Sequence, residues 1–115
     1  MSMPTGPSRR ELYRVIYPVA ERPAFDMGGF IHEVVDCSEV GLRYEVLDRR
    51  IPQVGAQLGG IIKWKRGGNT EVTGEVLRAR AGLVVLILDP PGIRFSDILL
   101  EQRYLRGKGF TLKDD

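Results

Sequence analysis

Two short groups of polar residues in this sequence could do chemistry: an arginine cluster at residues 8–15 and a turn at residues 36–41. The cluster contains Arg9, Arg10 and Arg14. A guanidinium group is planar, so it can pair with phosphate oxygens through two parallel hydrogen bonds, stack on a base, or bond the O6/N7 edge of guanine. By spacing alone, a short arginine cluster is more typical of a solvated surface segment. The cluster by itself therefore decides little.

The turn at residues 36–41 offers short polar side chains and a glycine between two strand-like runs. Asp36 can accept hydrogen bonds from the N1 and N2 atoms of guanine, and the Ser38 hydroxyl can donate to a phosphate. Gly41 would permit a backbone conformation, or a close approach, that a Cβ atom would obstruct. An ordinary turn between two strands has the same composition, so this segment is not specific by itself either.

A small closed barrel is the fold that we expect to position both groups. Runs rich in β-branched and aromatic residues, or apolar at every second position, alternate with glycine-containing turns. Closure would remove the exposed edges of an open sheet, and a two-sheet sandwich is the alternative. The expected strands are residues 29–36, 42–47, 61–65, 71–80 and 83–88, and a sixth could form at 13–17 in the arm.

The segments between and after these strands predict loops and one helix. Residues 51–60 contain one proline and three glycines and predict a loop, and residues 66–69 predict a hairpin turn. After the prolines at 90 and 91, apolar residues recur at spacings of three and four, which predicts a helix with one apolar face. Ser96 suits its N-cap and Gly107 its C-terminal cap.

Length and composition favour one domain. The chain has 115 residues, of which 43% are apolar, enough for a single modest core. We expect a disordered tail at residues 1–7, one domain at 8–107 and a second tail at 108–115. A single cysteine, no leader-like segment, and a longest apolar run of six residues (83–88) predict a cytoplasmic protein without membrane insertion.

The remaining candidate residues predict structural roles. His32 is the only histidine and has no metal-ligand spacing around it, so we expect a satisfied structural residue and no metal site. Cys37 is expected to be half buried and to lack a partner that would activate it as a nucleophile. We expect Trp64 to lie in the core, and Lys63, Lys65 and Arg66 to form a solvated hairpin face. Because no paired acid and base or activated nucleophile is present, we expect no enzyme and no cofactor.

The order of the two polar groups resembles the PilZ domain family. An RRxxxR arm at residues 9–14 is followed, 22 positions after Arg14 (36 minus 14), by a DxSxxG turn at 36–41. The strand at 72–78 and the C-terminal helix are also similar to that family, and the resemblance covers about residues 8–107. It implies an all-β fold with one helix, a six-stranded antiparallel β-barrel plus a C-terminal α-helix, that binds the bacterial second messenger cyclic di-GMP.

The resemblance also assigns roles to individual residues. It implies that Arg10 and Arg14 grip phosphate and guanine. Asp36 and Ser38 would contact guanine and the ligand backbone from the barrel surface, and Gly41 would shape the turn.

Two further positions bear on stoichiometry and turn geometry. Arg9 directly precedes the RxxxR pattern, where an arginine in this family goes with a stacked ligand dimer, so we expect two messenger molecules per chain. Val40 departs from the family, in which many members have a pair of glycines. We expect altered turn geometry there, with binding retained.

These expectations describe a stand-alone receptor. Ligand binding would order the arginine arm over the barrel, and the changed surface would signal to an unidentified effector protein in motility, attachment or exopolysaccharide control. The alternative is a small-barrel single-stranded nucleic-acid-binding protein that uses Trp64, Tyr44 and residues 63–66. Because the basic residues gather on the arm and exposed aromatic residues are few, we do not expect nucleic acid as a partner.

Overall fold

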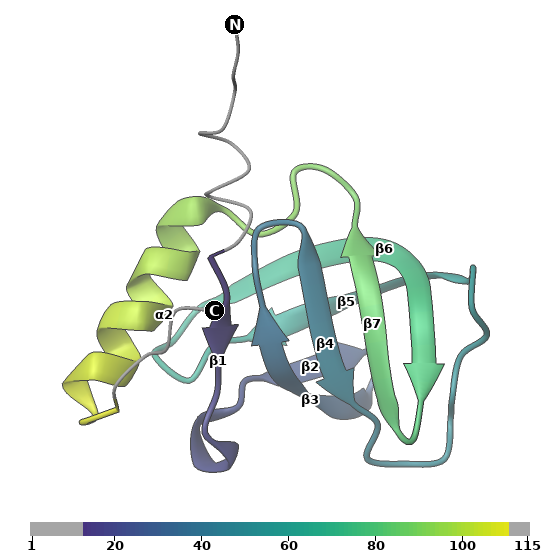
Figure 1. The fold of residues 1–115 in the computed structure, drawn as a ribbon, viewed down its shortest axis with the longest axis horizontal. Coiled ribbons are helices and arrows are strands. Elements are labelled where there is room, and N and C mark those ends of the chain that lie inside the picture. Colours follow the sequence, from purple (N-terminus) through teal and green to yellow (C-terminus); the bar gives the residue numbers. More distant parts are fainter. Residues whose placement is uncertain (1–12, 111–115) are drawn as a thin grey trace, which may run out of the picture.

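The computed structural model describes residues 13–110, in which strands β2 to β7 form a barrel and a helix lies beside it (Figure 1). A short strand and a single 3-10 turn precede the barrel. The elements are, in chain order, β1 (Val15–Ile16), η1 (Val19–Glu21), β2 (Ala24–Met27), β3 (Phe30–Cys37), β4 (Gly41–Glu45), β5 (Gln57–Lys63), β6 (Asn69–Arg80), β7 (Leu83–Leu88) and α2 (Phe95–Gly107).

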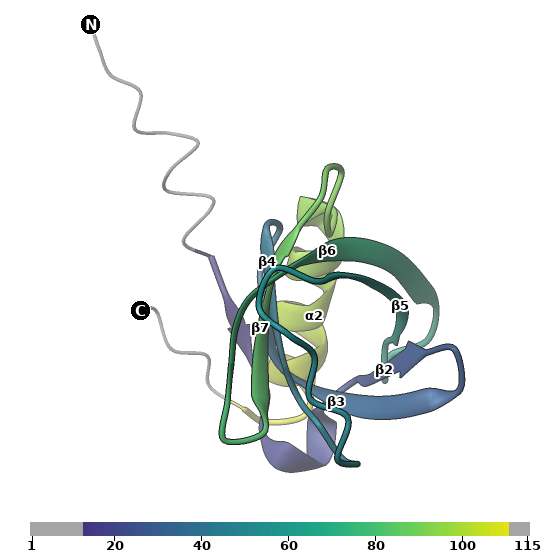
Figure 2. The same cartoon turned by 90° about the vertical axis from the view of Figure 1, so that its right-hand side faces the viewer.

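The barrel is closed by antiparallel pairs. Hydrogen bonding follows the order β3-β2-β5-β6-β7-β4, and β4 returns to pair with β3. Figure 2 looks along this ring, with α2 behind it. Strand β1 pairs with the last residues of β3, in the register Val15↔Cys37, beyond the part of β3 that pairs with β2. The predicted six-stranded barrel with one C-terminal helix is therefore confirmed, but its sixth strand was predicted in the wrong place. That strand is β2, which sequence patterns did not reveal, whereas residues 13–17 contribute only the two-residue β1 outside the ring.

Alternating side chains fill the barrel. On β4, Leu42 and Tyr44 are buried while Arg43 and Glu45 are not, as the period of two predicts. The same pattern holds for the inward residues of β6 and β7, and Trp64 is in the core as expected. The buried apolar residues are Val15, Tyr17, Phe25, Val34, Cys37, Leu42, Tyr44, Ile62, Trp64, Val72, Val76, Val84, Leu86, Leu88, Ile93, Ile98 and Leu105.

Helix α2 packs its apolar face onto the same core, with Ile98 and Leu105 fully buried. Two predicted caps are wrong. The helix begins at Phe95, with Arg94 at the N-cap position and no side-chain cap, so Ser96 lies inside the first turn.

No helix within residues 13–110 has the length and apolarity that a membrane crossing requires.

Helix α2 ends at Gly107, its C-cap residue is Lys108, and Gly109 is the left-handed glycine that follows the cap. Gly109 has a φ of +91°, and its N–H donates to the Arg106 carbonyl at 3.0 Å. The Phe110 N–H donates to the Leu105 carbonyl at 3.0 Å, and the Phe110 side chain packs on the core. Together these bonds form a Schellman motif.

Residues 1–7, and residues 111–115 of the second predicted tail, lie outside the described residues.

The predicted loop at 51–60 is wrong at its end, because residues 57–60 begin β5. Gly60 is there for close packing: a Cβ atom would lie 2.8 Å from Cε1 of Phe25 and 2.9 Å from the Asp26 carbonyl oxygen on β2. The glycine therefore lets two strands approach, where sequence patterns favour a break. The predicted hairpin at 66–69 is confirmed by positive φ angles at Gly67 and Gly68.

Candidate functional site

Four of the six predicted ligand residues line one pocket on the outside of the barrel. Arg14, Asp36, Ser38 and Gly41 border a space of about 250 Å³. The other two, Arg9 and Arg10, lie outside the described residues. The fold thus brings the end of the arginine arm next to the turn between β3 and β4.

Ser38 organises the turn between β3 and β4. Its Oγ accepts hydrogen bonds from the backbone N–H groups of Val40 at 3.3 Å and Gly41 at 3.1 Å, and its own N–H donates to the Gly41 carbonyl at 2.9 Å. Within residues 13–110 the hydroxyl hydrogen of Ser38 has no acceptor, so it can be donated to an oxygen atom in the pocket.

Gly41 is not required by the backbone of this turn, contrary to expectation. Its φ is not positive, and a Cβ atom would lie 3.6 Å from Ser38 Oγ and 3.7 Å from the Leu86 carbonyl oxygen, which is ordinary contact. A side chain here would instead occupy space beside the Ser38 hydroxyl. The effect of the neighbouring Val40, which also lines the pocket, stays a prediction.

Asp36 is held by an arginine that the sequence reasoning missed. Asp36 is only 3% exposed. Its Oδ2 accepts hydrogen bonds from both Nε and Nη2 of Arg43, the first at 2.9 Å. The two residues are direct partners in the β3–β4 register. A ligand that hydrogen-bonds to the Asp36 carboxylate must therefore share it with Arg43. The other N–H groups of Arg43 bond to no residue within 13–110 and can donate to the same ligand.

Strands β6 and β7 supply the floor of the pocket. Leu77, Arg78 and Ile87 line it, and Leu77 and Arg78 both face outward although they are adjacent in sequence. A register shift between Val76 and Arg78 explains this, because a β-bulge changes the face on which a residue lies. Strict alternation would have placed Arg78 inside the barrel, so sequence reasoning did not assign it to the site.

The charges around the pocket favour an anion. Arg14, Arg43 and Arg78 contribute three cations and Asp36 one carboxylate to its lining. Exposed apolar surface of Leu77 and Ile87 lies between them. This combination can bind phosphate oxygens and also accommodate a flat apolar group such as a base.

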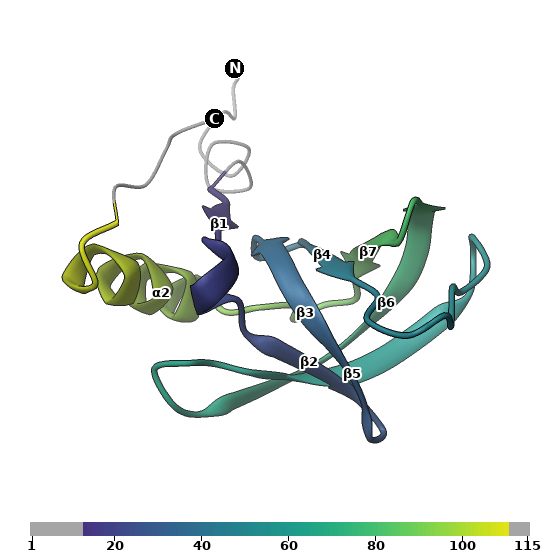
Figure 3. The same ribbon diagram turned by 90° about the horizontal axis from the view of Figure 1, so that it is seen from below.

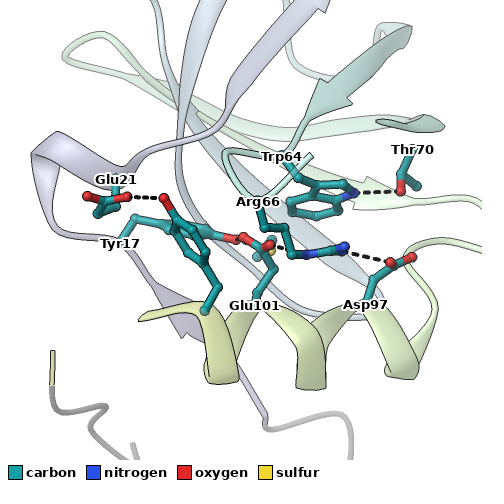
Figure 4. Close-up of polar contacts among 9 residues, drawn as sticks. Tyr17, Glu21, Trp64, Arg66, Thr70, Asp97 and Glu101 are labelled. Carbon is teal, nitrogen blue, oxygen red and sulfur yellow. Dashed lines mark hydrogen bonds and ion pairs between the residues drawn. The ribbon is translucent and has the colours of Figure 1, made fainter. Parts of the chain in front are cut away.

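A buried polar cluster links the segment after the arm to helix α2 (Figure 4). The Tyr17 hydroxyl donates to Oε1 of Glu101, and Arg66 donates to Oε2 of Glu101 and, at 2.8 Å, to Oδ1 of Asp97. Burial raises the pKa of the Glu101 carboxyl and that of the Tyr17 hydroxyl. Cys37 is fully buried beside Tyr17, with the hydroxyl and Sγ 3.9 Å apart.

This cluster corrects two expectations, and the expected core position of Trp64 is confirmed. Arg66 is not part of a solvated hairpin face, because two carboxylates hold it against α2, and Cys37 is fully buried where we expected it to be half buried. Trp64 is a core residue whose Nε1–H donates to Thr70 at 2.9 Å. His32 is buried, and its Nδ1 accepts a hydrogen bond from the Leu47 N–H at 3.2 Å.

The comparisons with known proteins identify a similar fold and no function. No family model matches the sequence, and no curated protein matches it. The crystal structure of an uncharacterized protein from Legionella is similar, with a TM-score of 0.60 and 20% sequence identity over 84% of this chain and 97% of that chain. This likeness concerns the barrel and helix alone.

Proposed function

We propose that this protein is a cyclic di-GMP receptor that binds the messenger between its arginine arm and the β3–β4 turn. One observation carries the proposal: Arg14 lines the same pocket as Asp36, Ser38 and Gly41, although at least 22 positions (36 minus 14) separate it from them in the chain. These are the residues through which the sequence resembles the PilZ domain family. No catalysis is proposed.

The chemistry of the pocket suits a ligand with two phosphodiester groups and two guanines. Arg14, Arg43 and Arg78 can form charge-assisted bonds with phosphate oxygens or bond the O6/N7 edge of guanine. The free hydrogen of the Ser38 hydroxyl can be donated to a phosphate oxygen. The Asp36 carboxylate can accept hydrogen bonds from N1 and N2 of guanine while it keeps its bonds from Arg43.

The proposed output is an arm ordered by ligand and offered to an effector protein. The chain passes from Arg14 into β1 and then to Tyr17, which is bonded to helix α2. An arm that closes over the ligand would thus be anchored at its base. By the resemblance, Arg9 would hold a second messenger molecule, and the effector would act in motility, attachment or exopolysaccharide control.

No observation favours the nucleic-acid alternative. Its two stacking candidates, Trp64 and Tyr44, are only 5% and 1% exposed, and Arg66 is paired with carboxylates. A buried ring cannot offer its face to a base.

Calorimetric titration with cyclic di-GMP tests the proposal. We expect saturable binding by the wild type, and about 10- to 100-fold weaker binding by Arg14→Ala and by Asp36→Ala, because a hydrogen bond to a charged group contributes about 1.5–3 kcal/mol. Arg103→Ala, an exposed arginine on α2, is the matched control and should bind as the wild type does. Arg14 is exposed as well, so its replacement should leave the fold intact.

Two results would reject the proposal. One is the absence of binding heat with the wild type at concentrations that saturate known receptors of this messenger. The other is unchanged affinity in both pocket variants when thermal unfolding shows them to be folded.

A further inference from the structure

Five exposed apolar side chains lie at the end of the barrel away from helix α2. Three connections meet at this end: the β2–β3 hairpin, the loop that joins β4 to β5, and the β6–β7 turn. They face the viewer in Figure 2, and Figure 3 shows them from below, with α2 on the other side of the barrel. The side chains, each between 44 and 66% exposed, are those of Phe30, Ile31, Leu47, Ile51 and Val54, which we call the barrel-end patch.

The two segments that carry the barrel-end patch are held in place by the barrel. The Leu47 N–H donates to Nδ1 of His32 on β3 at 3.2 Å. The Gly55 N–H donates to the Val76 carbonyl on β6 at 2.8 Å, so the β4–β5 loop is tied to the barrel near both ends. The hairpin and the loop line one cavity of about 240 Å³ between them. Because the patch needs little further ordering, binding loses little free energy as conformational entropy.

Two arginines at this end of the barrel have no carboxylate partner. The carboxylates of the hairpin strands, of the end of β4 and of the loop are all in ion pairs with other cations. These pairs are Asp26–Lys63, Glu33–Arg22, Glu45–Arg22 and Asp48–Arg50. Arg49 on the loop and Arg80 beside the β6–β7 turn are exposed, and their side chains form no ion pair or hydrogen bond within residues 13–110. Two unpaired cations therefore lie at the same end as the barrel-end patch.

An exposed apolar patch beside unpaired cations favours a partner that is both apolar and anionic. A membrane with acidic phospholipids has both properties, because its phosphate groups lie directly above hydrocarbon. Apolar side chains at that boundary reach the hydrocarbon, and an arginine can lie across it with its guanidinium group among the phosphates. A flat protein surface suits the patch less well, because the apolar side chains project from separate segments with a cavity between them.

We propose that this end of the barrel docks on an anionic lipid surface. The barrel-end patch would reach the boundary between headgroups and acyl chains, and Arg49 and Arg80 would bind lipid phosphates. The protein would lie on one leaflet and would not cross it. The inference does not rest on cyclic di-GMP binding, because none of these residues lines the pocket that contains Arg14 and Asp36.

Cosedimentation of the full chain with lipid vesicles tests this inference. We expect saturable binding to vesicles of phosphatidylglycerol and phosphatidylcholine in equal parts, and at least about tenfold weaker binding to phosphatidylcholine alone. The double variant Arg49→Ala/Arg80→Ala should bind the mixed vesicles about 25-fold more weakly, because each arginine near an anionic surface contributes about fivefold. The matched control is Arg103→Ala/Arg106→Ala, which changes two exposed arginines of α2, has the same net charge and should bind as the wild type does.

Val54→Asp tests the apolar part of the proposal, because it places a carboxylate at the most exposed residue of the barrel-end patch. It should bind the mixed vesicles at least about tenfold more weakly than the wild type. Val19→Asp is the matched control: Val19 is similarly exposed but lies on η1, which is bonded to α2 through Glu21 and Tyr104. It should bind as the wild type does. Thermal unfolding of both variants should stay close to that of the wild type, since both side chains are exposed.

The proposal is overturned if the wild type does not bind the mixed vesicles, or if it binds phosphatidylcholine alone equally well. It is also overturned if a barrel-end variant binds no more weakly than its matched control. A patch that instead joins two copies of the chain would give a dimer in sedimentation velocity that Val54→Asp dissociates, without vesicle binding, and that result too would overturn the proposal.

Discussion

Replacing Tyr17 by phenylalanine should destabilise the fold by about 2 kcal/mol. The Tyr17 hydroxyl is buried and donates to Oε1 of Glu101, so it ties the segment after the arginine arm to helix α2. The substitution keeps the ring in the core and removes only this donor. Glu101 would then be left in the interior with Arg66 as its one remaining hydrogen-bond donor among the described residues.

The magnitude follows from the charge and burial of the acceptor. A hydrogen bond to a charged group contributes about 1.5–3 kcal/mol to stability. Because Glu101 keeps its hydrogen bond from Arg66 in the variant, we expect a loss in the lower part of this range. A loss of about 2 kcal/mol is roughly a 30-fold change in the unfolding equilibrium. It should lower the melting temperature by about 8 °C or more for a domain of this size.

Urea denaturation followed by Trp64 fluorescence measures this loss, because Trp64 is the only tryptophan and lies in the core. Tyr104→Phe is the matched control: its hydroxyl donates to Glu21 at 2.7 Å in a more exposed setting, so we expect a loss of about 1 kcal/mol or less. This prediction is refuted if the free energy of unfolding of Tyr17→Phe is within about 0.5 kcal/mol of the wild-type value. It is also refuted if Tyr17→Phe and Tyr104→Phe lose equal stability.

Three further predictions concern packing, pH and thiol chemistry. Gly60→Ala should lower the free energy of unfolding by about 1–3 kcal/mol, because its new Cβ atom would clash with Phe25. Gly107→Ala should raise the free energy of unfolding by up to about 1 kcal/mol, because its Cβ atom would have no neighbour within 4 Å and alanine favours a helix. Changes of the same sign in the two variants would contradict this. Burial raises the pKa of Glu101 above its ordinary 4.5, so its stabilising contribution is complete below that pH and is lost as pH rises through the raised pKa. The stability of the wild type relative to Glu101→Gln, from denaturation at several pH values, should therefore fall from pH 4 upward, and a constant difference would count against it. Burial also raises the pKa of the Cys37 thiol, so a disulfide reagent at pH 8 should modify the native protein more slowly than the unfolded chain, and equal rates would refute this.

Much of the barrel could be predicted because its strands are buried on one face. The alternation at Leu42 and Tyr44 is the local pattern of a half-buried strand. The six-residue apolar run of β7 is too short for a typical helix and is bounded by glycine and proline, which indicates a strand. The start of β5 was missed because Gly59 and Gly60 look like a break, and their reason for being there, the close approach of β2, is a contact distant in sequence.

The candidate site could be predicted only where its residues are adjacent in sequence. Asp36 and Ser38 sit in one turn, but the contact between Asp36 and Arg43 depends on strand register, and the outward position of Arg78 depends on a bulge. Glu101 offered a usable signal, since it lies three residues after Ile98 and four before Leu105 on the buried face of α2. An acid at such a position indicates a buried partner, here Arg66.

The most direct test of the central claim is a two-dimensional amide NMR titration of the uniformly nitrogen-labelled protein with cyclic di-GMP. We predict saturable shifts at Ser38, Val40 and Gly41 and on the outer face of β6 and β7 around Arg78. An unchanged spectrum, or shifts confined to the hairpin at residues 63–69, would contradict it.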